Sequence, residues 1–363
     1  MRTISDTIAR MAAAGMPGGV IGATADRAEP FADFGSNPGA LTAHVYLPAA
    51  PPAGAPLVVA LHGCTQTAAA YDEGTGWSTL ADAAGFAVLL PEQRRANNAN
   101  LCFNWFDPVD IARAGGEAES IAQMTRALIA ARDLDPARVY VTGLSAGGAM
   151  TAVMLATYPD LFAAGAIIGG LPYAGAVTIS QALDRMRGHG ATDDASAAAA
   201  VRGAAGATTR VPAVSIWHGT ADATVAPANM ERLAAQWRGA HGLDASPCAT
   251  ERGAGWEHRT WADADGGAAV ETWRIAGMGH GVPIDPDGAA GLGRAGAYML
   301  DVGISSTRAI AASWGLVAAD RASDAPAPRP AAAAAATASP SAVAAASVQD
   351  VIEHALRAAG LMR

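Results

Sequence analysis

Residues 143–147, with the sequence Gly-Leu-Ser-Ala-Gly, constrain the fold of this chain more than any other segment. The β-branched residues before them predict a buried strand, and the small and apolar residues of 146–157 predict a helix. A serine at such a strand–turn–helix junction is held in a strained, exposed conformation, and flanking glycines let the neighbouring backbone approach closely. The helix would direct free N–H groups toward the position where an oxyanion forms. The pattern therefore predicts that Ser145 is a nucleophile.

Apolar runs and helical patterns alternate along the rest of the chain. Runs that suit buried strands occur at 57–61, 86–90, 138–142, 163–168, 211–217 and 270–276, with an edge-like alternation at 41–47. Helical patterns occur at 77–84, 117–132 and 146–157. Because parallel strands need crossover helices, this alternation predicts an α/β fold with a doubly wound, mostly parallel sheet and helices on both faces. Ligands of such sheets bind beyond the carboxyl ends of the strands.

Two further residues complete a catalytic arrangement with the serine. Asp222 lies in a loop after the predicted strand 211–217, and His280 follows the last predicted strand among glycines. A serine hydroxyl needs a base, and the base needs an orienting carboxylate. In sheets of this type the order along the chain is serine, acid, histidine, which is the order found here. Taken singly, Asp222 could be a turn residue and His280 a structural histidine, but their shared position after strands favours a triad.

An oxyanion needs two N–H donors beside the nucleophile. The first is expected from the backbone of Ala146, which directly follows Ser145. The second is expected from the loop 61–66, after an early strand, where we assign the amide of Cys64. A packed or bridged cysteine at this position is equally compatible with the sequence, and both roles can coexist. His62 and His218 lie in His-Gly turns and are expected to be structural.

Several classes of function find no support in the sequence. No His, Cys or carboxylate cluster has metal-ligand spacing, so no metal is expected. No glycine-rich dinucleotide or phosphate motif is present, so no cofactor is expected. The formal net charge is −9, from 24 basic and 33 acidic residues without a basic cluster, which argues against a nucleic-acid partner. No apolar run reaches the roughly 18–20 residues that span a membrane.

The chain divides into segments of different composition. Residues 41–320 are predicted to form the catalytic domain, after a peripheral segment at 1–40. Residues 178–210 form a polar, Ala-rich insertion, for which a cap over the site and a solvated helical excursion are both open interpretations. An Ala/Pro linker is predicted at 321–346, followed by an amphipathic helix at 347–363. We expect this helix to dock on the domain, with partner binding as the alternative.

Six motifs carry a resemblance to a known family. They are A-L-H-G-C-T-Q-T (60–67), G-W-S-T-L-A-D (76–82), L-L-P-E-Q (89–93), C-F-N-W-F (102–106), G-E-A-E-S-I (116–121) and V-Y-V-T-G-L-S-A-G-G-A-M (139–150). From about residue 41 to about 302, the chain resembles the esterase, poly(3-hydroxybutyrate) depolymerase family of α/β-hydrolases, near the feruloyl and acetylxylan esterases. The resemblance implies the same triad and oxyanion donors as above. It also implies a serine esterase that acts through an acyl-enzyme.

The implied substrates are hydroxyalkanoate oligomers, polyester or short-chain esters. A feruloyl or acetylxylan esterase is the alternative, and a non-catalytic binding scaffold is a third reading that the complete triad disfavours. Residues 321–363 contain no Phe, Trp or Tyr, so we expect soluble oligomers or amorphous polymer to be preferred over crystalline granules. The oligomeric state stays open.

The resemblance extends to three details of the site and to location. It implies a disulfide between Cys64 and Cys102 beside the oxyanion loop. It also implies that Trp105 forms an apolar wall for the acyl chain, although an ordinary core position is the alternative. Gln66 is expected to contact substrate. An extracellular or periplasmic location is implied, but Pro and Gly interrupt the apolar residues 11–24, so no clear signal peptide is visible and a removed signal stays open.

Overall fold

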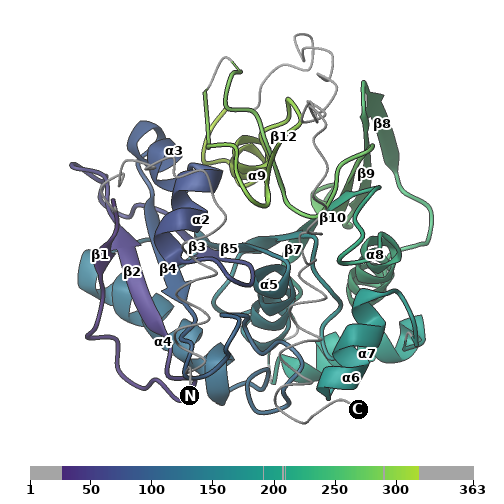
Figure 1. Cartoon of the computed structure of the whole chain (residues 1–363), viewed down its shortest axis with the longest axis horizontal. Helices are drawn as coiled ribbons and strands as arrows, with labels where there is room; N and C mark the ends of the chain where they lie inside the picture. The colour runs from purple at the N-terminus through teal and green to yellow at the C-terminus, as the bar shows by residue number, and fades with distance from the viewer. Residues whose placement is uncertain (1–26, 191, 207, 209, 289–290, 319–363) are drawn as a thin grey trace, which may run out of the picture.

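The computed structural model describes residues 27–318, except 191, 207, 209 and 289–290 (Figure 1). The predicted linker 321–346, the predicted helix 347–363 and most of the predicted peripheral segment therefore lie outside the described residues. The strands are β1 (Glu29–Pro30), β2 (Thr42–Tyr46), β3 (Leu57–Leu61), β4 (Ala87–Glu92), β5 (Val139–Leu144), β6 (Ala164–Ile168), β7 (Ala213–Gly219), β8 (Ala249–Gly253), β9 (Trp256–Ala262), β10 (Ala268–Ile275), β11 (Val282–Ile284) and β12 (Met299–Asp301). The helices are α2 (Ala68–Thr75), α3 (Trp77–Ala84), α4 (Gly116–Arg132), α5 (Ala146–Thr157), α6 (Ile179–Met186), α7 (Asp194–Ala204), α8 (Ala228–His241) and α9 (Ser306–Ser313).

A ten-stranded sheet forms the centre of the described residues, in the order β1-β2-β4-β3-β5-β6-β7-β10-β9-β8. Neighbouring strands are parallel from β4 through β10. The strands at both edges pair antiparallel. The predicted mostly parallel sheet is therefore confirmed, and every strand expected in its centre is present. Because β5, β7 and β10 are parallel, their carboxyl ends meet at one edge of the sheet.

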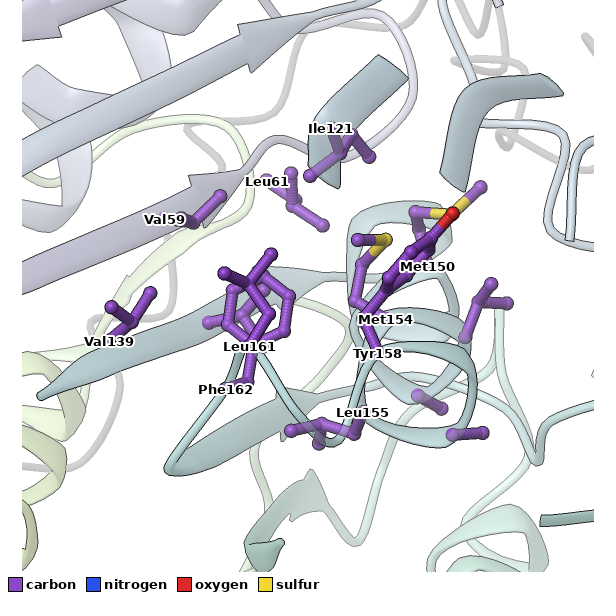
Figure 2. Close-up of a cluster of buried hydrophobic side chains, with 14 of the residues drawn as sticks. Val59, Leu61, Ile121, Val139, Met150, Met154, Leu155, Tyr158, Leu161 and Phe162 are labelled. Atoms are coloured by element: carbon purple, nitrogen blue, oxygen red, sulfur yellow. The ribbon is translucent and has the colours of Figure 1, made fainter. Parts of the chain in front are cut away.

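Helices cover both faces of this sheet, and alternate side chains of each strand point into one of two cores. On β3, Leu57, Val59 and Leu61 belong to the first core, while Val58 and Ala60 belong to the second. The first core also contains buried side chains of α4, α5 and α8, some of which Figure 2 shows around β3 and β5. The second contains side chains of α2, α3 and α9. Burial on both faces explains why the central strands are continuous apolar runs.

The β8–β9 hairpin at one side of the sheet was not predicted. His258 lies within β9 and stacks on Trp273 of β10, with ring centroids 4.0 Å apart. Its Nε2 is 2.9 Å from a carboxylate oxygen of Glu271, on the same strand as Trp273. Both hairpin strands are mostly exposed or half-buried. Their polar side chains lack the apolar run that reveals a buried strand.

The insertion at 178–210 contains the two helices α6 and α7. Helix α7 packs on α8, where the amide of Gln236 and the guanidinium of Arg202 bond backbone carbonyls of the facing helix. Gly239 of α8 leaves room for Ala198 of α7, because a Cβ at Gly239 would lie 2.7 Å from the Cβ of Ala198. The insertion is therefore packed against the domain, which does not fit a fully solvated excursion.

Candidate active site

Ser145 lies in a sharp turn between β5 and α5, where its backbone has φ 59° and ψ −116°. This is a strained conformation for a residue with a side chain, and it persists only where the surroundings enforce it. Its N–H donates to the carbonyl of Ile168 at 2.9 Å, and its own carbonyl accepts from the N–H of Ala149 at 2.8 Å. A Cβ on Gly147 would lie 2.3 Å from the carbonyl oxygen of Leu61, so only glycine fits there. The predicted elbow is therefore formed.

Asp222 and His280 meet beyond the ends of β7 and β10. The Nδ1 atom of His280 is 2.7 Å from Oδ2 of Asp222. The other carboxylate oxygen accepts the N–H groups of Thr224 and Val225 at 2.9 and 2.8 Å. A carboxylate at Nδ1 holds the ring proton there and leaves the Nε2 lone pair free to accept a proton.

The carboxyl of Asp222 is held in its ionised form. Burial alone would raise its pKa, but hydrogen bonds from His218 and His280 and the charge of His280 hold that pKa well below its usual range. An ionised Asp222 stabilises a positive charge on His280 when the imidazole takes a proton.

Gly169 connects the serine to the histidine. It follows Ile168, whose carbonyl binds the Ser145 N–H. A Cβ on Gly169 would lie 3.3 Å from Cε1 of His280 and 3.7 Å from Oδ2 of Asp222. The segment at the end of β6 thus adjoins Ser145 on one side and the Asp222–His280 pair on the other. The structure pairs Asp222 with His280, and the bond from the Ser145 hydroxyl to His280 stays a prediction.

His218 makes a contact with the acid that the sequence prediction missed. Its Nε2 lies 2.8 Å from the carbonyl oxygen of Val225 and 3.3 Å from Oδ2 of Asp222. The ring therefore links the end of β7 to the turn that carries the carboxylate, so the structure gives it the structural role expected of it and a place beside Asp222. The sequence offered one indication of this contact, which is that His218 and Asp222 are four residues apart on either side of the end of β7.

The predicted oxyanion loop is held on both sides of Cys64. The side-chain carbonyl of Gln66 accepts the N–H of Gly63 at 2.9 Å, and the N–H of Thr65 donates to the carbonyl of Asn100 at 2.7 Å. A disulfide joins Cys64 to Cys102, the pair that the family resemblance implies. Gln66 thus has a bond that shapes the loop, and its expected contact with substrate stays a prediction.

Trp105 is buried and belongs to an apolar cluster with Cys102, Ala146, Leu171 and Val225. Its ring meets that of Phe106 edge to face, with centroids 5.6 Å apart. The cluster includes Ala146, the residue directly after the serine. Trp105 therefore lies in a core and also adjoins the proposed oxyanion site. This position is compatible with an ordinary core residue and with an apolar wall for the acyl chain.

Glu117 is a buried carboxyl that the sequence analysis did not identify, and it supports the oxyanion loop through Gln93 and His62. Glu117 is 1% exposed, and one of its oxygens accepts the backbone N–H of Asn104 at 2.8 Å. The other oxygen accepts the side-chain amides of Asn104 and Gln93. The backbone N–H of Gln93 in turn donates to Nε2 of His62, at 3.1 Å, at the base of the oxyanion loop.

Burial raises the pKa of Glu117 to about 8, and the nearby Asp110 adds to the rise, while the hydrogen bonds from Asn104 and Gln93 oppose it. A glutamate in the first turn of a helix ordinarily faces solvent and complements the helix dipole. The position of Glu117 in the first turn of α4 therefore predicts a solvent-exposed side chain, and the sequence alone does not reveal that it is buried.

Among the residues that the structure describes, no group of three or more His, Cys, Asp or Glu side chains is placed to hold a metal ion. None of the described helices is long and apolar enough to cross a membrane.

Comparison with known proteins finds ester hydrolases similar to this chain. The family described as "Esterase PHB depolymerase" matches residues 41–260. The chain is 48% identical to "Poly(3-hydroxyalkanoate) depolymerase C" of Paucimonas lemoignei, over 78% of this chain and 69% of that protein. It is 32% identical to "Probable acetylxylan esterase A" of Aspergillus flavus, over 71% of this chain and 85% of that protein. The solved structure of an acetyl xylan esterase from Aspergillus awamori has a TM-score of 0.66 and 29% identity, covering 72% of this chain and 96% of that one.

Replacing Glu117 by glutamine is expected to flatten the dependence of folding stability on pH between about pH 5 and 8. In the wild type the folded state keeps the Glu117 proton in this window, whereas the unfolded state releases it near the ordinary glutamate pKa of about 4.3. The free energy of unfolding should therefore fall by up to about 1.4 kcal/mol per pH unit from this group as pH rises. Urea unfolding at several pH values measures the slope. Glu29→Gln, at an exposed position, should keep the wild-type slope, and equal slopes in all three proteins would contradict the prediction.

Removing the disulfide is expected to weaken both the fold and the oxyanion loop. The bridge closes a loop with a sequence separation of 38, so Cys64→Ser/Cys102→Ser should lower the free energy of unfolding by about 2–4 kcal/mol. The turnover number for ester hydrolysis should fall as well, because the loop of the proposed oxyanion donor Cys64 keeps its hydrogen bonds but loses its covalent link. Cys248→Ser is the matched control, since Cys248 is free and exposed. A double variant with wild-type stability and turnover would show that the bridge supports neither.

Proposed function

Because the chain belongs to the esterase PHB depolymerase family and is a carboxylic ester hydrolase, we propose that Ser145 carries the acyl group during the reaction, with His280 as base and Asp222 as the acid that orients it. The observation that carries this proposal is the 2.7 Å hydrogen bond between Asp222 and Nδ1 of His280 beside the strained turn of Ser145. The non-catalytic scaffold is disfavoured, since such a scaffold has no need for this costly backbone conformation.

In the first half of the reaction, Oγ of Ser145 attacks the ester carbonyl carbon and gives its proton to Nε2 of His280. The carbonyl π electrons move to the oxygen, and the backbone N–H groups of Cys64 and Ala146 stabilise the oxyanion. One such donor is worth about 3–4 kcal/mol of transition-state stabilisation. The carbonyl then re-forms, the bond to the alcohol oxygen breaks, and His280 returns the proton to that oxygen.

Water completes the cycle in the second half. His280 removes a proton from water as its oxygen attacks the acyl carbon of Ser145. The second oxyanion collapses, the bond to Oγ breaks, and His280 gives the proton back to the serine. Asp222, ionised and fixed by two backbone N–H groups, stabilises the imidazolium in both halves.

The substrate class that we favour is the ester of a hydroxyalkanoic acid. The identity of 48% to a poly(3-hydroxyalkanoate) depolymerase exceeds the 32% to an acetylxylan esterase. The apolar cluster of Trp105, Leu171 and Val225 beside Ala146 suits an aliphatic acyl chain. An acetylxylan or feruloyl ester is the second candidate, supported by the solved acetyl xylan esterase at a TM-score of 0.66.

Ser145→Ala is expected to lower kcat for p-nitrophenyl butyrate by about 10³-fold or more, with little change in KM, because the variant loses the nucleophile but keeps the binding surface. Initial rates from absorbance at several substrate concentrations measure both constants. Ser246→Ala, at an exposed position before β8, should match the wild type. A wild-type rate in Ser145→Ala would remove Ser145 from the mechanism.

A panel of esters should separate the two substrate classes. We expect kcat/KM to be higher for soluble 3-hydroxybutyrate oligomers than for acetylated or feruloylated xylo-oligosaccharides. The reason is that the apolar cluster near Ala146 favours an aliphatic acyl chain over an acetyl or feruloyl group. Chromatography of the released acids measures each rate, with Ser145→Ala as the blank. The reverse ranking would establish the carbohydrate esterase alternative.

A further inference from the structure

A small cavity of about 50 Å³ adjoins the apolar cluster that contains Ala146. Trp105 and Leu171 belong to both the cluster and the cavity wall. The rest of the wall comes from the loop after β6, from α6, α7 and the segment between them, and from α8. An engineered cavity that binds benzene measures about 150 Å³, so this one suits a few atoms rather than an aromatic or sugar ring.

Two guanidinium groups line this cavity without a carboxylate partner. Arg232 donates from Nη2 to the carbonyl of Gly188 at 2.6 Å. Arg185 donates from Nε to the carbonyl of Gly175 at 2.7 Å and from Nη1 to that of His189 at 2.9 Å. Within the described residues neither arginine forms an ion pair, although Asp194 also lines the cavity. Both guanidinium groups therefore bond backbone carbonyls, and two positive charges line this space against one carboxylate, which favours an anion.

Two buried polar atoms of the lining residues also lack a partner among the described residues. They are Nη1 of Arg232, a donor, and Oδ1 of Asn229, an acceptor. Asn229 is fully buried, and its Nδ2 donates to the carbonyls of Arg185 and Ala226 at 2.9 and 3.1 Å. Those two acceptors fix the orientation of the amide, so Oδ1 needs a donor from elsewhere. Unpaired buried groups are costly, so a bound group with both an anionic oxygen and a hydroxyl would satisfy the pair.

We propose that this cavity is a subsite for the terminal carboxylate of a hydroxyalkanoate oligomer. This inference rests on the proposed function and narrows its substrate to chains with a free acid end. In such an oligomer the terminal carboxylate belongs to the alcohol side of the last ester bond. In the substrate the carboxylate is the group that Arg232 would bind, because the β-oxygen is still part of the ester. Hydrolysis frees that oxygen as a hydroxyl, which can donate to Asn229 once the 3-hydroxy acid is released from the acyl carbon.

The test compares the 3-hydroxybutyrate dimer as its free acid and as its methyl ester. For the wild type we expect KM to be about tenfold lower for the free acid at low salt, with the ratio shrinking toward one in 1 M NaCl. Arg232→Gln should abolish the ratio at low salt. Arg238→Gln is the matched control and should keep it, because Arg238 is on the same helix and bonds a backbone carbonyl at 3.0 Å but does not line the cavity.

The outcomes separate a failure of the proposed subsite from a failure of the proposed esterase function. Equal KM values for acid and ester in a wild type that hydrolyses p-nitrophenyl butyrate would overturn the subsite and leave the proposed function intact. A ratio that survives in Arg232→Gln would also overturn it. If Arg232→Gln fails to fold, Arg185→Gln and the salt dependence of the wild-type ratio decide. A wild type that hydrolyses no ester would instead overturn the proposed function.

Discussion

The close approach of backbone around Ser145 is the constraint on which the rest of the site depends. A Cβ on Gly143 would lie 2.5 Å from the carbonyl carbon of Gly147, and one on Gly148 would lie 2.8 Å from the carbonyl oxygen of Ile168. These contacts leave no space between β5, β6 and α5. Ser145 in this turn therefore adopts a positive φ, and α5 begins directly beside the oxyanion loop. The same packing that strains the turn fixes both proposed oxyanion donors.

Buried polar groups outside the triad hold the loops that this packing leaves free. His218 ties the turn of Asp222 to the end of β7. The Cys64–Cys102 disulfide holds the oxyanion loop directly, and Glu117 binds the side chain of Gln93, whose backbone N–H donates to His62 in that loop. Each is a buried polar or covalent link to a segment without regular secondary structure, where apolar packing alone specifies position poorly. The precision of the site therefore depends on residues that do not touch the ester.

The centre of the sheet and the members of the candidate triad could be predicted, because both follow from local patterns and one geometric rule. Buried strands are apolar runs, and residues just after parallel strands converge at one edge. Ser145, Asp222 and His280 all satisfy that rule. The β8–β9 hairpin escaped prediction because its strands are mostly exposed or half-buried and mostly polar. Glu117 escaped because its partners, at positions 93 and 104, meet it only after folding.

The sequence by itself determined the order of the central strands, the helices α3, α4 and α5, the glycines of the serine turn and which residues follow the central strands, since these depend on neighbours along the chain. Only the tertiary structure decided that Arg185, Arg232 and Asn229 line one cavity and that Glu117 is buried against residues 93 and 104. Burial and pairing depend on segments far apart in the sequence. An arginine or glutamate can be a solvated surface charge in one tertiary structure and a buried group without an ion-pair partner in another.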